Sequence, residues 1–492
     1  MTDRIMMIVP IVVYFAMLLC ITYFSGRSAI NHNDAIGFME EYFLGGRSMN
    51  GPVLAMAIVT TYTSASSFVG GPGVAYNVGL GWILASMIQV PTAFLTLGVL
   101  GRRFALISRR TKTVTICDFI RARYDSEIVV ILASAAMIVF FMASMLAQLI
   151  GGARLFEAIT GYSYQTGLII FGLTVVIYTT MGGFRAVVLT DTIQGFMMII
   201  ASAAILCAVV TAGGGVSTVM QKLYEIDPRL LTPYGPDNYL PKPFTLSLWI
   251  LVGVGVLGLP QTTQKCLACK DSRSVHNAMI IGTFVVGFTM LVMHLVGAMG
   301  RAVVPGITIG DLAVPTITVR LLSPFWAGIF IAGPIAAIMS TVDSMLIMCS
   351  AAIVKDLYFH YVAKDEEVRI SPQKVRKMSF IVTAVVGILV MIAAVRPPSL
   401  LVWINLFAFG GLESVFLCPT LFGLFWRRAN SLGTILSILA GTAAFFRFSV
   451  DSVTVAGMSP IVPTLAISAV VFVLGSLFGR PESEERLKYF DI

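Results

Sequence analysis

The chain has 492 residues, of which 57% are hydrophobic and only 12% are charged, and its formal net charge is +8. Water-soluble globular proteins contain about 45–50% apolar and about 25% charged residues, so this composition excludes an ordinary soluble protein. The apolar runs last about 20 residues, which fits membrane-spanning helices and not the roughly 10-residue alternating strands of a β-barrel.

We therefore expect an all-α polytopic membrane protein with about thirteen membrane-spanning helices. The first apolar run, 5–24, is too long for the hydrophobic part of a signal peptide, so it is interpreted as the first span. An odd number of spans would place the two termini on opposite sides of the membrane. The predicted spans begin near residues 5, 50, 80, 127, 163, 189, 244, 277, 322, 377, 400, 432 and 460.

Positive charge is concentrated in alternate loops. Most of the 33 lysines and arginines fall in loops on the side opposite the N-terminus. Because cytoplasmic loops are enriched in Lys and Arg, we predict that the N-terminus is outside and that the C-terminal tail is cytoplasmic. The charge of +8 is thus a topology signal, and we expect no nucleic-acid partner and no obligate protein partner beyond the lipid bilayer. One cytoplasmic loop alone carries Arg102, Arg103, Arg109, Arg110, Lys112, Arg121 and Arg123.

The second predicted span contains a stretch that should break a helix, TTYTSASSFVGGPG (60–73). In hydrocarbon an unsatisfied backbone group is costly, so a broken helix survives only where it is buried in protein or lines a cavity. Hydroxyl groups can satisfy the freed backbone groups, and freed carbonyls can coordinate a cation. A tightly packed interface of small residues is the alternative interpretation of this segment taken alone.

A second interruption follows five spans later, in LWILVGVGVLGLPQTTQKC (248–266). Its three glycines precede Pro260 and a run of polar residues. The spacing of the two interruptions predicts two inverted repeats of five helices, each with a broken first helix. Interruptions at matching positions of two repeats indicate a binding site near the middle of the membrane.

The ninth predicted span carries a polar face within a long apolar helix, FIAGPIAAIMSTVDSMLIMCSAAIVKD (330–356). Ala337, Ser340 and Thr341 share one helical face, with the spacing i, i+3 and i+4. Asp343 and Ser344 repeat this spacing from Ser340 on an adjacent face. An acid inside the membrane usually serves an ion or a proton; a structural hydrogen bond is the alternative. Oxygen ligands of this kind suit hard cations. We expect Na⁺, with protons as the alternative.

Asp191, in VVLTDTIQGF (187–196), is a second acid, near the inner end of the sixth predicted span. It is a candidate for the same ion pathway. The alternative is that Asp191 is a solvated acid at the end of a helix, close to Arg185.

Several runs are similar to signatures of the sodium:solute symporter family. YTTMGGFRA (178–186) resembles its glycine-pair signature. GLFWRRANSLGTILSILAGTA (423–443) resembles a second signature, although Thr434 stands where alanine is usual. EEYFLGGRSMNG (40–51) resembles the approach to the family's first broken helix. The likeness extends over essentially the whole chain, and TYTSASSFVGGPGVAYNVGLGW and NLFAFGGLESVFLCP are similar to pantothenate-transporting members.

The resemblance implies a LeuT-like core and sodium-coupled symport of pantothenate by alternating access. Another small monocarboxylate or an amino acid is the alternative substrate. No enzyme activity is expected, and Na⁺ as coupling ion is the only cofactor. The resemblance implies that the protein is located in the bacterial cytoplasmic (inner) membrane. The implied transporter domain, 1–492, divides into an extra helix and loop (1–48), a first repeat (49–213), a second repeat (244–430), extra C-terminal helices (431–480) and a cytoplasmic tail (481–492).

The family's sodium ligands correspond to the backbone carbonyls of Thr60, Thr63 and Ala337 and to the hydroxyls of Ser340 and Thr341. Some relatives hold a second sodium ion. The matching positions in this chain are Asp191, Ser340, Asp343 and Ser344. Several relatives have a serine in place of Asp343, so the resemblance does not assign that carboxylate a role.

The family's substrate contacts come from both broken helices and from the span after the first. Proline transporters carry an aspartate at the position of Tyr62, which argues against proline. Arg154 is a candidate to pair with a substrate carboxylate, and His294 is expected to be a packed core residue. The corresponding substrate-binding positions are Tyr62, Ser64, Ser67, Ser86, Gln89, Gln261 and Thr262.

Overall fold

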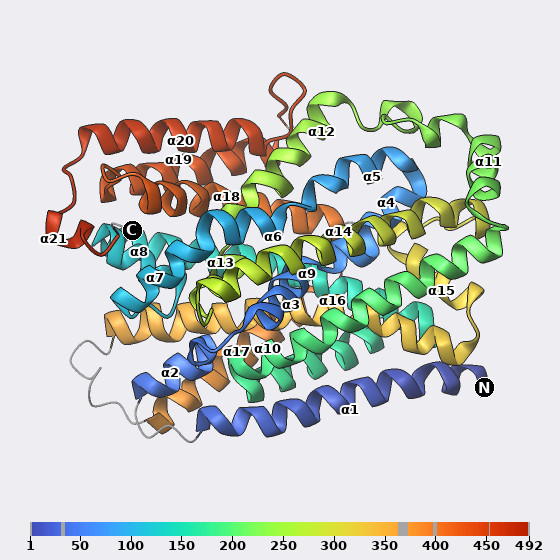
Figure 1. Ribbon diagram of the computed structural model, residues 1–492, viewed down its shortest axis with the longest axis horizontal. Coiled ribbons are helices and arrows are strands. Elements are labelled where there is room, and N and C mark those ends of the chain that lie inside the picture. The colour runs from blue at the N-terminus through green and yellow to red at the C-terminus, as the bar shows by residue number, and fades with distance from the viewer. Residues whose placement is uncertain (1, 31–34, 363–371, 397–400, 452, 491–492) are drawn as a thin grey trace.

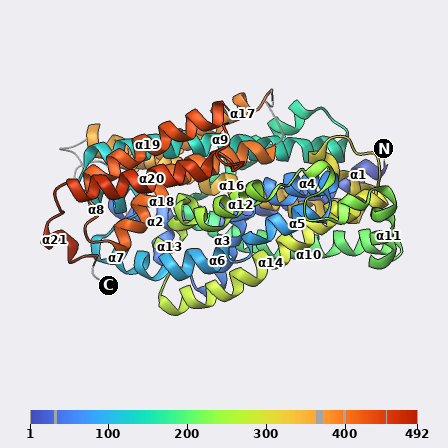
Figure 2. The same cartoon turned by 90° about the horizontal axis from the view of Figure 1, so that it is seen from above.

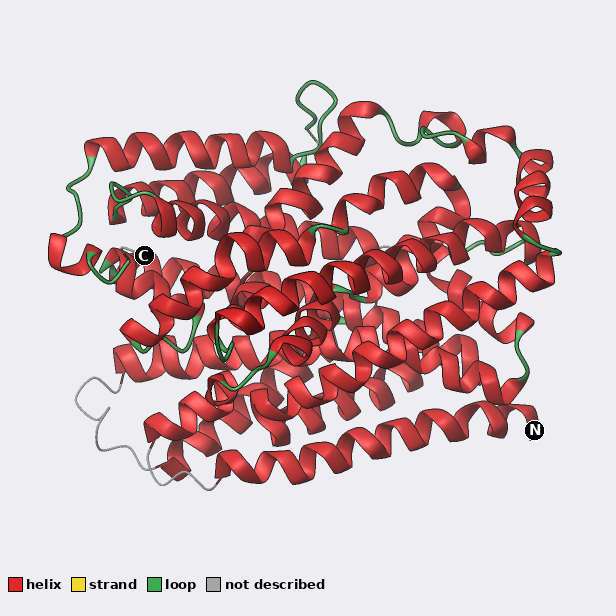
Figure 3. Cartoon of the chain, viewed as in Figure 1, coloured by secondary structure: helices red, strands yellow, loops and turns green. Residues whose placement is uncertain are grey.

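The computed structural model describes residues 2–30, 35–362, 372–396, 401–451 and 453–490. Within these ranges the chain forms helices and loops, and no strand appears (Figure 3). Most of the long helices run along the long axis of the molecule (Figure 1). A helical bundle of this kind satisfies the backbone hydrogen bonds inside each segment, as the hydrocarbon of a membrane requires. The expected all-α fold is confirmed.

Nine long helices in the described parts of the chain make up most of the bundle. They are α1 (Thr2–Ile30), α9 (Glu127–Thr160), α10 (Tyr164–Gly213), α14 (Ser272–Val303), α16 (Pro324–Ala351), α17 (Pro372–Ala393), α18 (Leu401–Phe425), α19 (Ser431–Val450) and α20 (Ile461–Phe478).

Within the described ranges, three further membrane segments are composite, because turns of different helical pitch or a break interrupt them. They are α3 (Gly51–Tyr62) with α4 (Gly71–Val78), α5 (Leu80–Ser86) with α6 (Thr92–Leu95) and α7 (Arg102–Thr111), and α12 (Lys242–Trp249) with α13 (Pro260–Leu267). Short helices connect the segments at both ends of the bundle. These are α2 (Ala35–Leu44), α8 (Ile116–Tyr124), α11 (Val216–Ile226), α15 (Ala313–Leu321) and α21 (Glu484–Leu487).

The described residues contain eleven helices that are long and apolar enough to cross a membrane, or twelve when the bent pair at the first break counts as one span. The predicted number was thirteen, and the difference lies in α10. This element has 50 residues and joins two helices at Gly183, whose φ of 63° is non-helical. At a rise of 1.5 Å per residue the two parts, 164–182 and 184–213, are about 28 and about 45 Å long, so each is long enough to cross a bilayer of about 30 Å. The sequence had divided the same residues into two spans, starting near 163 and 189.

The two termini lie at opposite ends of the bundle (Figure 1). The basic helices α7 and α8 lie at the end that also holds the C-terminus, and α11 lies at the other end, with the N-terminus. This arrangement is the one that an odd number of membrane crossings produces.

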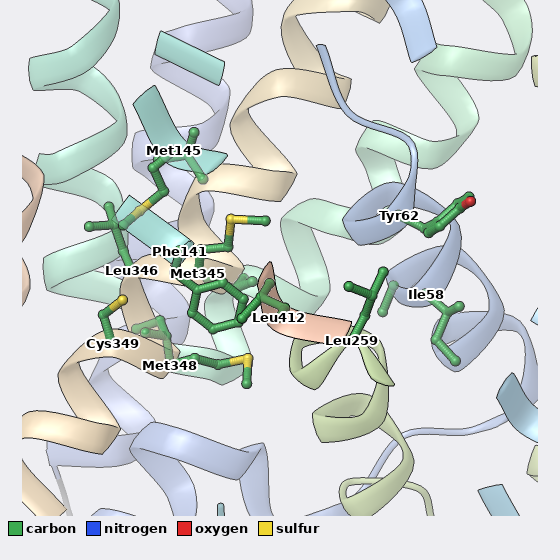
Figure 4. Packing of buried hydrophobic residues seen from close by; sticks show 14 of the residues in the cluster. Ile58, Tyr62, Phe141, Met145, Leu259, Met345, Leu346, Met348, Cys349 and Leu412 are labelled. Carbon is green, nitrogen blue, oxygen red and sulfur yellow. The ribbon is translucent and has the colours of Figure 1, made fainter. Parts of the chain in front are cut away.

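Helix α16 passes through the middle of the bundle (Figure 2), and every residue from Ile331 to Ala351 is buried. Its apolar side packs on α9, where Met345 and Met348 lie beside Phe141 (Figure 4). Its polar side therefore faces away from lipid, toward α3 and α10.

Candidate functional site

The first predicted break is a sharp bend. The helical segments Gly51–Tyr62 and Ser66–Val78 meet at an angle of 67°. The N–H of Ala65 donates to Oε1 of Gln148 on α9, at 2.7 Å, instead of to a carbonyl one turn earlier. The N–H of Ser66 likewise donates to the hydroxyl of Ser64. The carbonyl groups at the end of α3 are thereby released from helical hydrogen bonds.

The polar face of α16 lies against these released carbonyls. The hydroxyl of Ser340 donates to the carbonyl of Thr60 at 3.0 Å, and it also lies 3.2 Å from the carbonyl of Ala337. The hydroxyl of Thr341 lies 3.4 Å from the same Thr60 oxygen. All four residues are completely buried. Two hydroxyls and two carbonyls thus converge from two helices, which is a ligand set that suits a hard monovalent cation.

Thr63 is the fifth residue predicted for this site. It ends α3 with an extended backbone conformation, and its side-chain hydroxyl turns back to the carbonyl of Val59. The side chain is therefore engaged within its own helix, and only the backbone carbonyl is left to serve a cation.

Asp343 is buried one turn further along α16. The hydroxyl of Tyr178 on α10 donates to its Oδ2 at 2.6 Å, and the hydroxyl of Ser344 lies 3.4 Å from its Oδ1. Ser344 also contacts the hydroxyl of Thr61, at 3.1 Å. The structure thus joins two of the candidates for a second sodium ion, Asp343 and Ser344, to the end of α3.

Asp191 is completely buried in α10, so it is not the solvated helix-end acid that was the alternative. Its Oδ2 accepts a hydrogen bond from Nζ of Lys265 on α13 at 2.9 Å, while Arg185 pairs with Glu41. Sequence reasoning missed Lys265, whose side chain is only 1% exposed. The available signal was a lysine within 15 residues of three glycines and a proline, at the end of the second interrupted span.

A cavity of about 50 Å³ lies beside the first break. It is lined by α3, α4, α5, α12, α14 and α18. Five of the seven predicted substrate residues line this cavity: Tyr62, Ser64, Ser67, Ser86 and Gln89.

The other two predicted substrate residues, Gln261 and Thr262, do not line it. They lie beyond the second break, at the start of α13, where the hydroxyl of Thr262 turns back to the carbonyl of Leu259. The second broken span instead presents Leu248 and Val252 to the cavity. The prediction had matched the polar residues after Pro260 to the family's substrate contacts. In the structure these residues follow the turn at 255–258 and lie away from the cavity.

Polar residues that were not predicted complete the lining. Nε1 of Trp82 and the hydroxyl of Ser66 are buried there without a hydrogen-bond partner among the described residues. Asn405 lines the cavity as well, and its Oδ1 accepts from Gln148 at 3.2 Å. His294, expected to be a core residue, also faces the cavity, with its Nδ1 2.6 Å from the carbonyl of Met290.

Arg154 does not reach the cavity. Its guanidinium group pairs with Glu157 at 2.8 Å, one turn along α9, and lies over the ring of Tyr164. Its proposed pairing with a substrate carboxylate is therefore not supported by this geometry.

Glu413 is a further acid that sequence reasoning missed. It is buried in α18, and neither carboxylate oxygen has a hydrogen-bond partner among the described residues. It lies against Gly255 of the second broken span, where an added Cβ would stand 2.1 Å from Oε2. In the view of Figure 4, Leu259 from the same span lies between Leu412 of α18 and Ile58 of α3. The rule that singled out Asp343, an acid within an apolar helix, applies equally to Glu413.

Comparison with known proteins identifies relatives over nearly the full chain. The sequence profile of the sodium:solute symporter family matches residues 42–441. The sodium/pantothenate symporter of Escherichia coli (strain K12) is 46% identical over 472 residues, which is 96% of each chain. The sodium/pantothenate symporter of Haemophilus influenzae is 48% identical over 448 residues, 91% of this chain and 92% of the relative.

Among solved structures, a substrate-bound, outward-open Na⁺-coupled sialic acid symporter has a similar fold. The TM-score is 0.77 at 19% sequence identity, and the match covers 97% of this chain and 99% of the other. At this identity the likeness concerns the fold alone.

Proposed function

The chain belongs to the sodium:solute symporter family, and on this premise we propose that it takes up pantothenate together with Na⁺ by alternating access. It is a multi-pass membrane protein with a LeuT-like fold. The observation that carries the proposal is the meeting of α16 with the first break, where the hydroxyls of Ser340 and Thr341 lie on the freed carbonyl of Thr60. With the carbonyls of Ala337 and Thr63, these atoms form the proposed sodium site.

The cavity is the proposed substrate site. Pantothenate carries hydroxyl groups, an amide and a carboxylate, and the lining offers hydroxyl, amide and indole groups. Ser66 and Trp82 are donors whose buried polar atoms have no hydrogen-bond partner in the described parts of the chain. A buried donor without a partner is costly, so a ligand that supplies acceptors gains free energy there. The segment that begins at Ser66 also directs its N-terminal end to this side, which favours a carboxylate.

Sodium binding and substrate binding are coupled because both proposed sites use the end of α3. The segment from Thr60 to Ser67 contributes both to the sodium site and to the cavity. Sodium bound between Thr60 and Ser340 would hold α3 against α16 and keep the neighbouring cavity in a form that accepts substrate. Loss of sodium would free α3 to move, which opens the opposite side. We propose that the N-terminal end of the bundle faces outward and that the basic end with α7 and α8 faces the cytoplasm of a bacterial cell.

The test is uptake of labelled pantothenate into proteoliposomes that contain only this protein, with and without an inward Na⁺ gradient. Accumulation above equilibrium with Na⁺, and none with K⁺ or with a proton gradient alone, is expected. Labelled proline and a small monocarboxylate such as lactate serve as competing substrates. Sodium-driven uptake of one of these without uptake of pantothenate would retain the sodium site and refute the substrate.

A further inference from the structure

Three buried titratable side chains lie near one another, one each on α10, α13 and α16. Lys265 donates to Oδ2 of Asp191 at 2.9 Å, and both side chains are at most 1% exposed. The ammonium group also lies 4.9 Å from the centre of the Phe184 ring. Asp343, on α16, is close enough to interact electrostatically with both. The cluster therefore contains two carboxyl groups and one amine.

Asp343 is in contact with hydroxyl groups at both carboxyl oxygens. The Tyr178 hydroxyl lies 2.6 Å from Oδ2 and 3.2 Å from the carbonyl of Met339, and the Ser344 hydroxyl lies 3.4 Å from Oδ1. Within the cluster, Lys265 forms its ion pair with Asp191, and this pair is neutral by itself.

We propose that the ammonium group of Lys265 takes the place of a second sodium ion beside Asp191, so that this protein binds one Na⁺ per substrate molecule. The inference rests on the proposed function for its first sodium site. It deepens that function by fixing the number of coupling ions.

Charge repulsion supports one ion. A second Na⁺ beside Asp191 would stand next to the ammonium group of Lys265, which already neutralises that carboxylate. Like charges at low dielectric repel strongly, so the ion pair disfavours a cation there.

Ligand availability supports the same conclusion. Asp191 has one oxygen engaged by Lys265, and only its Oδ1 is without a partner in the part of the chain that the structure describes. Sodium in proteins needs several oxygen ligands at once, as other hard cations do. The hydroxyl of Ser344 is shared between Thr61 and Asp343.

One Na⁺ with one monovalent anion moves no net charge. Accumulation should then equal the Na⁺ ratio, about tenfold for a tenfold gradient, and it should not respond to membrane potential. Two Na⁺ ions would give about a hundredfold from concentration alone, and a negative interior would raise this further.

The first experiment counts sodium on the purified wild-type protein by equilibrium binding of radioactive Na⁺, which requires no substrate. One ion per chain with a Hill coefficient of 1 is expected. Two ions per chain would overturn the inference and leave the proposed function intact. No bound sodium would overturn both.

The second experiment replaces Lys265 with alanine, which frees Asp191 and leaves space beside it. Binding of a second Na⁺ and a Hill coefficient approaching 2 are expected, together with uptake that responds to a valinomycin-imposed potential. Lys270→Ala, an exposed lysine five residues away, is the matched control and should stay at one ion. In Lys265→Ala/Asp191→Asn the second ion should be lost again. A single ion in Lys265→Ala protein that still binds the first ion normally would contradict the proposal.

Discussion

Removal of the Ser340 hydroxyl is expected to weaken sodium binding without abolishing transport. Ser340→Ala deletes a ligand that lies 3.0 Å from the Thr60 carbonyl, its proposed partner in holding sodium. Contacts between a polar group and a charge contribute about 1.5–3 kcal/mol. The Na⁺ concentration for half-maximal uptake should therefore rise by about 10- to 150-fold, at 1.4 kcal/mol per factor of ten. The remaining ligands, including Thr341, still allow sodium to bind at higher concentration.

The assay is initial-rate uptake of labelled pantothenate in proteoliposomes across a series of Na⁺ concentrations at constant ionic strength. The maximal rate at saturating Na⁺ should stay within a few fold of the wild type, because the substrate cavity does not include Ser340. Ser350→Ala is the matched control: Ser350 is equally buried on α16, but its hydroxyl bonds to the carbonyl of Ser379, away from the first break.

Two results would refute the reasoning. The first is an unchanged sodium dependence in Ser340→Ala, which would remove the hydroxyl from the ion site. The second is an equal shift in Ser350→Ala, which would show that loss of any buried hydroxyl on α16 has this effect.

Three other substitutions test residues that support the two broken helices and the loops around them. Gln148→Leu leaves the N–H of Ala65 without a hydrogen-bond partner at the break, which costs about 1–3 kcal/mol of folding free energy. Both the melting temperature and the uptake rate should fall. An unchanged uptake rate would show that the bend between α3 and α4 does not need this hydrogen bond. Gly255→Ala should lower uptake, because its Cβ would stand 2.1 Å from the carboxylate of Glu413, which must move to make room. Glu413→Ala in the same chain should restore part of the uptake, and failure of this rescue would show that the loss has another cause. Burial raises the pKa of Asp311 to about 6, above the unfolded value of about 3.9, so its ionisation opposes folding as the pH rises through this interval. Asp311→Asn should therefore stabilise the protein by up to about 3 kcal/mol at pH 8 and by about half of that at pH 5. The gain is measured as the rise in melting temperature in detergent. An equal gain at both pH values would contradict the raised pKa of Asp311.

Much of the site could be predicted because membrane chemistry is restrictive. Hydroxyls, glycines and prolines in an apolar span are expensive unless they have a purpose, so the break at 60–73 and the face around Ser340 stood out in the sequence alone. The structure brings these two segments into hydrogen-bond contact, as the prediction of a shared cation site requires. The helical periodicity on α16 was enough to select the residues, since i, i+3 and i+4 positions share a face in any helix.

The sequence by itself determined the class of protein and nearly all the membrane segments, because both depend on local hydropathy. It also predicted the polar face of α16 that belongs to the proposed sodium site, because residues on one helical face follow from local spacing. Only the tertiary structure decided the partners of the buried charges. Lys265 and Asp191 are 74 residues apart in sequence and meet because the Lys265 side chain extends from α13 to α10. The path of the chain after the second break likewise decided that Gln261 lies away from the cavity while Asn405 lines it. Hydropathy records whether a side chain is buried in the membrane, whereas its contacts depend on how separate helices pack, and local sequence does not encode that packing.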